Sequence, residues 1–344
     1  MFEPACPLPL TDYPAVLLAH GAGGRLMHQL LEQLIRPALG GTAPAEQHDA
    51  AVLTPADGRP ALTTDGYVVR PLFFPGGDIG TLAVYGTVND LAMAGARPRA
   101  LTLGLILEEG LPMDSLWRVL CSVRAAADAV GVPVVTGDTK VVERGRGDGL
   151  YITSSGFGTL APGVDLRPAR IADGDAVLLS GDVGRHGIAV LAQREGLAFE
   201  TTLESDCAPL HEVIAALLAA GIDLHCARDL TRGGLAAAVV ELAMQSGRGV
   251  RLEEAAIAVA TPVAAACDLL GFDPLHVACE GRFVAYVPAA QADAALEVLR
   301  RVAPGGAAAA CIGRVGGRQT VLRGRFGVER ALELPAGELL PRIC

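Results

Sequence analysis

Lysine is almost absent from this chain: Lys140 is the only one among its 28 basic residues, and the others are arginines. The 38 acidic residues outnumber them, which gives a formal net charge of −10. A nucleic-acid surface needs clustered basic residues, so this balance argues against nucleic acid as a partner. Nucleotides stay possible as ligands, because Mg²⁺ can bridge protein carboxylates to phosphates.

Long apolar runs are also missing, although 51% of the residues are hydrophobic. The most apolar stretch, 255–272, is interrupted by Thr261, Pro262 and Asp268, whereas a membrane-spanning helix needs about 20 predominantly apolar residues. The N-terminus has no positively charged segment followed by an apolar run, so it does not look like a targeting signal. We therefore expect no membrane association and a cytoplasmic location.

Several common sequence patterns are absent as well. The eight cysteines include no CxxC pair, which argues against a zinc site or a disulfide framework. The sequence has no GxxxxGK[ST] phosphate loop, no Rossmann glycine fingerprint and no HExxH motif. Most cysteines are expected to be small buried hydrophobic residues. Cys344 differs from them, because no residue follows it in the sequence.

Strand-like and helix-like segments alternate in both halves, which predicts an α/β or α+β fold. A length of 344 residues suits about two domains. We expect an irregular extension over 1–14, an N-terminal domain over 15–160, a C-terminal domain over 170–333 and a flexible tail over 334–344. A strand is predicted over 49–53, and a final hairpin is predicted from 311–316 and 319–324.

Five aspartates stand beside small or apolar residues at predicted strand or helix edges: Asp49, Asp65, Asp90, Asp138 and Asp229. Converging carboxylates repel one another unless a cation lies among them, and hard oxygen ligands favour Mg²⁺. The alternative is that each aspartate caps a helix or closes a turn. Spacing alone leaves both interpretations open.

Two other features favour phosphate or substrate chemistry. The glycine-rich turn at 231–234 precedes a long predicted helix, where backbone N–H groups can bind phosphate. An ordinary turn is the alternative for any one glycine pair. Lys140 in GDTK is a compact charge that can change its protonation state when buried, unlike arginine. Its alternative is an exposed position in a hairpin.

Two residues could take part in a reaction directly. Glu280, in ACEGRF, is predicted at the start of a strand, where its carboxylate could act as a general base; an ion pair with Arg282 is the alternative. Cys344 could carry a group between sites, because it ends a polar tail without periodicity. An accidental terminal cysteine is the alternative there, since no CaaX lipidation motif is present.

These segments together resemble one known family. The matching motifs are NDLAMAG at 89–95, GDTK at 137–140, DLTRGG at 229–234, ACEGR at 278–282 and the terminal PRIC at 341–344. They resemble the HypE family of hydrogenase maturation factors, which are carbamoyl dehydratases. That family lies within the wider group of ATP enzymes similar to aminoimidazole ribonucleotide synthetase and selenophosphate synthetase. The terminal motif is the specific one, and the others suit the wider group too.

The resemblance implies two α/β domains: an N-terminal domain that forms a barrel-like sheet with its copy in a homodimer, and a sandwich-like C-terminal domain. It implies ATP and Mg²⁺ as cofactors. The residues implied are Asp49, Asp90 and Asp229 as metal ligands, Asp65, Asp138, Asn89, Thr231 and Gly233 in the nucleotide pocket, and Cys344, Glu280 and Lys140 in catalysis. His48 departs from the family pattern, because an acid often stands before Asp49.

The implied reaction begins with a carbamoyl group that the carbamoyltransferase HypF places on the sulfur of Cys344. ATP would phosphorylate the amide oxygen, Glu280 would take the N–H proton, and loss of phosphate would leave a thiocyanate. The HypC–HypD iron scaffold would then accept cyanide for [NiFe]-hydrogenase. Two alternatives stay open: an ATP-dependent synthetase of the same group acting on a free small molecule, and a non-catalytic, nucleotide-regulated thiol carrier.

Overall fold

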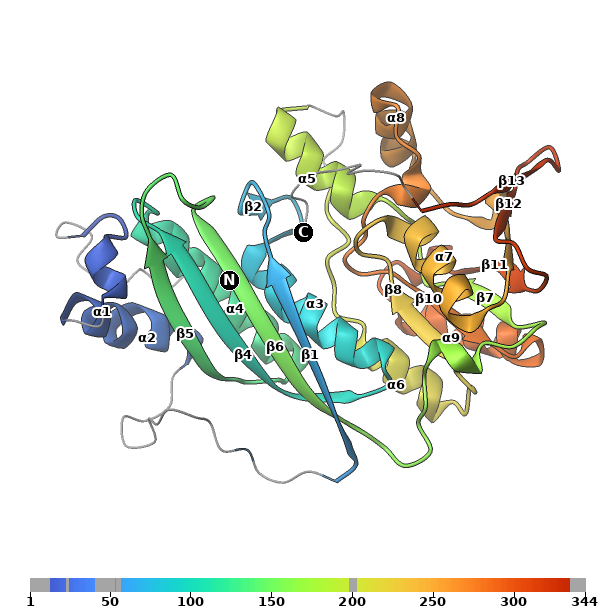
Figure 1. The fold of residues 1–344 in the computed structure, drawn as a ribbon, viewed down its shortest axis with the longest axis horizontal. Coiled ribbons are helices and arrows are strands. Elements are labelled where there is room, and N and C mark those ends of the chain that lie inside the picture. Colours follow the sequence, from blue (N-terminus) through green and yellow to red (C-terminus); the bar gives the residue numbers. More distant parts are fainter. Residues whose placement is uncertain (1–12, 23–24, 41–52, 54–56, 198–202, 335–344) are drawn as a thin grey trace.

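The computed structural model describes residues 13–22, 25–40, 53, 57–197 and 203–334 (Figure 1). Asp49 and Cys344 lie outside these ranges, as does most of the strand predicted over 49–53. Within the described residues, no helix is both long and apolar enough to cross a membrane.

The first half is built on a four-stranded sheet of order β1-β6-β4-β5. The strands are β1 (Arg59–Tyr67), β4 (Arg97–Glu108), β5 (Val134–Val142) and β6 (Leu150–Leu160). β4 runs parallel to β5 and antiparallel to β6, which is also antiparallel to β1. A short ribbon of β2 (Phe73–Phe74) and β3 (Gly77–Asp78) leads into the first long helix.

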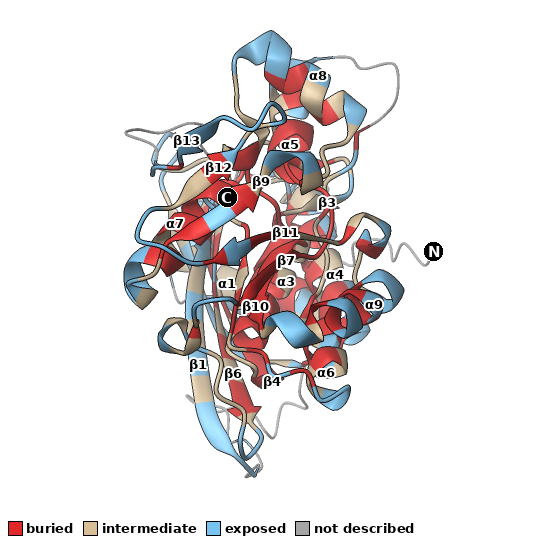
Figure 2. Ribbon diagram, turned by 90° about the vertical axis from the view of Figure 1, so that its right-hand side faces the viewer, coloured by how far each residue is buried: buried red, intermediate tan, exposed pale blue. Residues whose placement is uncertain are grey.

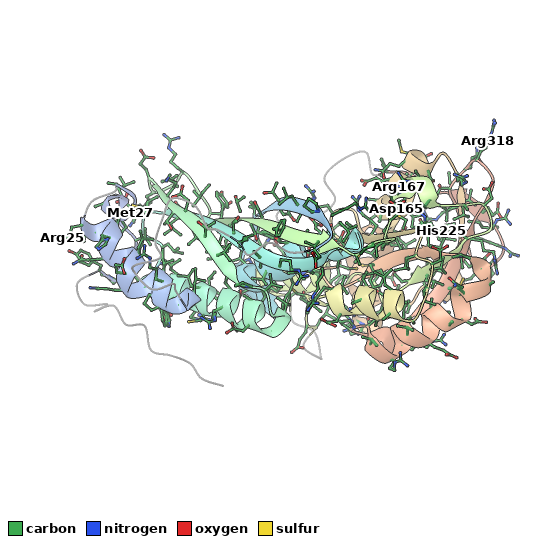
Figure 3. The ribbon with its side chains drawn as sticks, turned by 90° about the horizontal axis from the view of Figure 1, so that it is seen from below. Arg25, Met27, Asp165, Arg167, His225 and Arg318 are labelled. Carbon is green, nitrogen blue, oxygen red and sulfur yellow. The ribbon has the colours of Figure 1, made fainter. Side chains whose placement is uncertain are left out.

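Helices cover one face of this sheet in the described residues, and side chains alone extend from the other (Figure 3). The covering helices are α3 (Ile79–Met93) and α4 (Met113–Val130), and a further helical segment contains α1 (Arg25–Leu30) and α2 (Arg36–Leu39). Because strand side chains alternate between faces, β1 alternates in burial, and Leu62 is 79% exposed. The sheet therefore has an open face that includes apolar side chains.

The second half contains a seven-stranded sheet of order β13-β12-β9-β11-β7-β10-β8. The strands are β7 (Ala176–Leu179), β8 (Cys226–Asp229), β9 (Val250–Glu253), β10 (Phe283–Val287), β11 (Ala310–Val315), β12 (Val321–Arg323) and β13 (Glu329–Ala331). The helices are α5 (Arg185–Glu195), α6 (His211–Ala219), α7 (Gly234–Ser246), α8 (Thr261–Leu270) and α9 (Ala292–Val302).

Helices pack on both faces of this second sheet. Val177 and Leu179 of β7 pack with α7, while Leu178 packs with α6 and α9. A strand with helices on both sides has to be apolar throughout, and all four residues of β7 are buried. Figure 2 shows this central region as almost entirely buried.

The predicted final hairpin is wrong. β11 pairs with β7 and β9, whereas β12 pairs with β9 and β13. β9 lies between the two segments that were predicted to pair, and no strand was predicted over 250–253. The two segments are close in sequence, but pairing within a sheet also depends on strands that are distant in sequence, here β9.

The two halves meet along α3. This helix packs against β1 and β6 of its own sheet and also contacts α6 and β8 of the second half. The segment 203–210, which precedes α6, follows the same junction: the N–H of Ser205 donates to the carbonyl of Pro75 at 2.8 Å. Residues from both halves are thus held side by side along α3.

Candidate functional site

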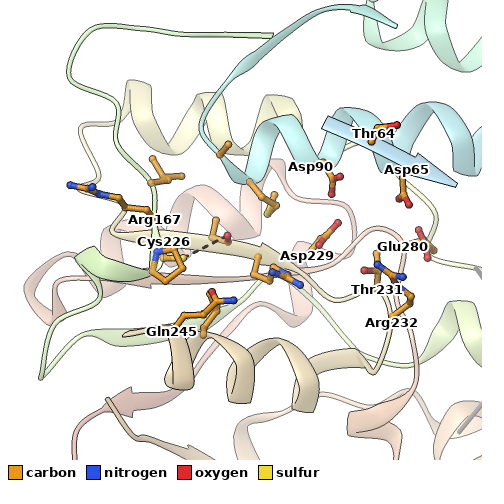
Figure 4. Close-up of a pocket in the computed structure, with 18 of the residues that line it drawn as sticks. Thr64, Asp65, Asp90, Arg167, Cys226, Asp229, Thr231, Arg232, Gln245 and Glu280 are labelled. Carbon is orange, nitrogen blue, oxygen red and sulfur yellow. Dashed lines mark hydrogen bonds between the residues drawn. The ribbon is translucent and has the colours of Figure 1, made fainter. Parts of the chain in front are cut away.

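A cavity of about 470 Å³ opens at this junction, and both halves of the chain line it (Figure 4). The first half contributes the end of β1 and one side of α3. The second half contributes β8, the loop after it, and Glu280. Four acidic residues line the cavity: Asp65, Asp90, Asp229 and Glu280. The structure therefore brings together four residues that the sequence analysis selected separately.

Local structure explains how the three aspartates converge. Alternation along β1 directs Thr63 and Asp65 to the face that carries α3, and the hydroxyl of Thr63 donates to Oδ2 of Asp90 at 2.7 Å. Asp90 lies in the last turn of α3, and Asp229 is the last residue of β8. Thr63 was not predicted, although it stands two residues before Asp65 on the same face of the strand.

Burial dominates the electrostatics of the acidic group. Loss of solvent raises the pKa of Asp229 to about 7, and the charge of Asp90 adds to the increase. Burial likewise raises the pKa of Asp90. It raises the pKa of Glu280 well above its usual range, with Asp229 and Asp206 adding to the effect. A cluster of buried acidic residues favours a bound cation, which would stabilise the charged carboxylates.

The described residues contain no complete set of protein metal ligands, because no three acidic, histidine or cysteine side chains among them lie close enough together to hold one metal ion. Asp90 and Asp229 both line the cavity, whereas Asp49 is outside the described residues. A pair of carboxylates still fits Mg²⁺, which is usually held by one or two carboxylates together with substrate phosphates and water.

Basic side chains complete the wall of the cavity and were missed by the sequence analysis. Arg167, Arg228 and Arg232 line it, and the charges of Arg228 and Arg232 act to lower the pKa of Asp90. The signal was present in ARDLTRGG, where two arginines flank Asp229. Arginine suits phosphate because its planar group donates several hydrogen bonds.

Thr231, which was expected in a nucleotide pocket, lines the cavity, and Gly233 lies just before α7. Gly233 has φ 76°, and a Cβ there would lie 2.5 Å from the Cβ of Ala237. Glycine is therefore required by the backbone of this turn. The first turn of α7 contains N–H groups that have no partner within the helix, and these groups lie close to Thr231.

Asn89 does not line the cavity, which differs from the cofactor contact predicted for it. Its side chain is 1% exposed. The amide nitrogen donates to the carbonyls of Ala208 at 3.0 Å and Glu280 at 3.3 Å, and the amide oxygen accepts from the N–H of Leu210 at 2.7 Å. All three partners belong to the second half, so the side chain joins backbone segments.

Asp138 and Lys140 do not line the cavity of one chain either. They lie on β5, at the sheet edge opposite to β1, where Asp138 is the partner of Gly104 on β4 and Lys140 is the partner of Ile106. Both side chains point to the open face and are more than 60% exposed. The hydrogen bond from Lys140 lowers the pKa of Asp138. The predicted shared pocket of Asp65 and Asp138 therefore does not form within a single chain.

Comparisons with known proteins agree with this architecture. The AIR synthase related protein N-terminal domain matches residues 47–160, and the corresponding C-terminal domain matches residues 172–323. Carbamoyl dehydratase HypE of Azotobacter vinelandii is 50% identical over 333 residues, which are 96% of this chain and 97% of that protein.

Two solved structures are similar over nearly the whole fold. Hydrogenase maturation protein HypE in complex with ATP has a TM-score of 0.91 and 44% identity, covering 95% of this chain and 99% of the other. A HypE–HypF complex includes a chain with a TM-score of 0.78 and 40% identity, covering 91% of this chain and 100% of the other.

Two α/β halves with an acid-lined cavity at their junction define a protein of the AIR synthase related class. Within that class, the chain belongs to the carbamoyl dehydratase HypE family. The family resemblance and the fold class inferred from the sequence are thereby confirmed.

Proposed function

We propose that this chain catalyses the ATP-dependent dehydration of a carbamoyl group carried on the sulfur of Cys344. The product is a thiocyanate, which supplies cyanide ligands for [NiFe]-hydrogenase. The observation that carries this proposal is the convergence of Asp65, Asp90, Asp229 and Glu280 on one cavity, in a chain whose relatives are named carbamoyl dehydratases. The ATP complex of a similar structure supports ATP as the co-substrate.

Mg²⁺ and the nucleotide phosphates would share the acidic end of the cavity. Asp90 and Asp229, together with Asp49, would hold Mg²⁺, whose charge offsets that of the phosphates when it is bound. Thr231 and the N–H groups at the start of α7, after Gly233, would hold phosphate oxygens. Asp65, which lines the cavity from β1, would orient the same phosphates.

The residues of the cavity suit the dehydration of an amide. Oxygen is a poor leaving group from an amide, so the carbamoyl oxygen first attacks the γ-phosphorus of ATP and ADP departs. One N–H proton passes to solvent, and the phosphorylated oxygen then leaves as phosphate while Glu280 accepts the second N–H proton. The overall change converts S–C(O)NH₂ and ATP to S–C≡N, ADP, phosphate and a proton. Burial raises the pKa of Glu280, which makes its ionised carboxylate a stronger base for the N–H proton.

A homodimer would bring Lys140 to the cavity, which the single chain does not do. The cavity reaches both faces of β1, because Thr64 and Gly66 of the open face line it together with Asp65. If the open faces of two copies close into a barrel-like sheet, β5 of one chain can approach β1 of the other. Asp138 and Lys140 would then enter the cavity of the second subunit, where Lys140 stabilises charge on the reacting phosphate.

The tail has enough length to bring Cys344 to the cavity. It leaves the second sheet beside β13, at the edge opposite to β8. Six strand spacings of about 4.8 Å amount to roughly 29 Å, and the ten residues after 334 span up to about 35 Å when extended. The same tail would visit a HypF carbamoyl donor, consistent with the HypE–HypF complex of a similar chain, and then a HypC–HypD acceptor in the cytoplasm.

Mass measurement of the C-terminal peptide tests the proposal. The full chain is incubated with a HypF-family protein and its carbamoyl source, and ATP is then added. We expect the peptide to gain one carbamoyl group and then to lose one water only when ATP is present. A carbamoylated peptide that never loses water would favour the thiol-carrier alternative. Turnover of a free small molecule by a chain lacking Cys344 would favour the synthetase alternative.

A further inference from the structure

The backbone of Glu280 lies outside any regular element. β10 begins only at Phe283, and Glu280 stands in the turn before it. A buried peptide N–H or carbonyl outside a helix or ladder needs another partner. Here both partners are side chains: the N–H of Glu280 donates to Oδ1 of Asp206 at 3.0 Å, and its carbonyl accepts from Nδ2 of Asn89 at 3.3 Å.

The two partners are themselves connected. Asn89 belongs to α3 of the first half, and it also holds Ala208 and Leu210 on either side of one short segment. Asp206 lies two residues before Ala208 on that segment. The three backbone contacts of Asn89 and the one of Asp206 therefore form a closed network across the domain junction, with Glu280 at its centre.

Asp206 is unusually placed for a residue with only a structural role. It is 6% exposed, and its Oδ2 has no hydrogen-bond partner among the described residues. The nearest cation is Arg282, whose Nε lies 3.8 Å from that oxygen. A Cβ on Gly281 would come within 2.0 Å of the carbonyl of Asp206, so the two backbones touch. Such close packing restricts the movement of the adjacent Glu280 peptide.

We propose that Asn89 and Asp206 are positioning residues for Glu280, holding its peptide from both sides so that its carboxylate faces the acidic end of the cavity. Figure 4 shows that carboxylate beside Asp65 and Asp229. The inference rests on the proposed function, because Glu280 is the proton acceptor there. The inference adds that contacts across the domain junction fix the position of Glu280. A displacement of its carboxylate by about 1 Å can lower the rate about 100-fold.

Four variants of the full chain test this inference: Asn89→Leu, Asp206→Ala, Asp206→Asn and Ser180→Ala. Asn89→Leu removes the amide partner with little change in size, and Asp206→Ala removes the acceptor. Asp206→Asn keeps an acceptor oxygen for the N–H of Glu280. Ser180→Ala is the matched control, because the Ser180 hydroxyl accepts from the N–H of Phe283, three residues beyond Glu280.

The measurements are kcat for thiocyanate formation, KM for ATP and the midpoint of thermal unfolding. We expect Asn89→Leu and Asp206→Ala to lower kcat by about 10- to 100-fold, with KM for ATP changed less than about twofold. Asp206→Asn should recover most of that loss. Ser180→Ala should lower the unfolding midpoint and leave kcat close to that of the unmodified chain.

Three results would overturn the inference: equal losses in Asp206→Asn and Asp206→Ala, a loss in Ser180→Ala as large as in Asn89→Leu, or an unchanged kcat in Asp206→Ala. The Asp206 pair decides the matter even if Asn89→Leu does not fold. If the unmodified chain itself forms no thiocyanate, the proposed function fails. If it does and the variants match it, only the positioning role fails.

Discussion

Lys140 and Asp138 form an ion pair on the open face of the first sheet, with 2.7 Å between Nζ and Oδ2. They are two residues apart on β5, so they point to the same side of the strand. The pair lies at the far edge of the sheet from Asp65, and the chain does not bring it to its own cavity. An isolated pair this exposed contributes at most about 1 kcal/mol to folding.

The first prediction concerns the only lysine of the chain. Lys140→Ala should lower thiocyanate formation by about 100-fold or more, since it removes a charge aimed at the reacting phosphate. Stability should change little, because the ion pair is exposed. Lys140→Arg should not restore the rate, because a planar guanidinium cannot replace a compact ammonium group. Single-turnover rates and thermal unfolding would measure both effects.

Mixed dimers test whether Lys140 acts across the subunit interface. Lys140→Ala protein and Glu280→Gln protein are each slowed by at least about 100-fold alone in this scheme. Random exchange of subunits should restore about a quarter of full turnover, since half of the dimers are mixed and each has one intact site. A mixture that stays inactive after proven exchange would place Lys140 and Glu280 in the same subunit's site.

The second prediction concerns proton transfer. Glu280→Gln removes the acceptor while keeping size and hydrogen bonding, so thiocyanate formation should fall by about 100- to 10,000-fold. Nucleotide affinity should be nearly unchanged, because the residue meets the carbamoyl end of the reaction. Calorimetric titration with a non-hydrolysable ATP analogue gives the affinity. Undiminished turnover would remove Glu280 from the mechanism.

The acidic site was largely predictable, because Asp65, Asp90 and Asp229 each stand in a motif at the end of an element. Their convergence needed only the family resemblance and the order of the elements. The sequence could not show that Asn89, next to Asp90, points away from the cavity. Successive residues of a helix differ by about 100° in direction, and the packing of α3 against the second half decides which one faces inward.

Long-range pairing was the least predictable part of the fold. The elements around α3 and α4 follow from local signals such as glycine at a helix end, as at Gly95 with φ 78°. The position of β9 between β11 and β12 does not follow, because a four-residue strand carries little periodicity. Asp138 is a similar case in the site. The alternation of side chains along β5 predicts which face of the sheet it lies on, but it does not predict whether that face packs against the same chain or a second subunit.

The third prediction concerns the carrier. Removal of Cys344, or Cys344→Ala, should abolish the protein-bound nitrile completely, because no other thiol would present the carbamoyl group. ATP binding and thermal stability should be unaffected, since in this scheme the Cys344 thiol carries the substrate and does not hold the nucleotide. Intact-mass measurement after incubation with donor and ATP detects the product. Cys311→Ala is the matched control, as Cys311 is a partly exposed cysteine outside the cavity; nitrile found on the Cys344→Ala chain would refute the assignment.

The last prediction follows from the protonation of Asp229. Burial raises its pKa in the folded chain to about 7, above the usual value near 3.9 of an unfolded aspartate. Between these values the folded state binds more protons than the unfolded one, so this group lowers stability as the pH rises towards 7. Asp229→Asn should therefore raise the unfolding midpoint of the metal-free chain at pH 8 and have little effect at pH 4.

Added Mg²⁺ and ADP should reverse that order. They stabilise the folded state through binding, and the unmodified chain should gain more than Asp229→Asn, which lacks one metal-ligating carboxylate. Thermal unfolding at pH 6 and pH 8, with and without Mg²⁺·ADP, measures the difference. Asp175→Asn is the contrasting control: Asp175 is buried outside the cavity and paired with His225 at 2.7 Å, so its loss should destabilise the chain with or without the metal. Equal stabilisation of the unmodified and Asp229→Asn chains by Mg²⁺·ADP would mean that Asp229 does not bind the cation.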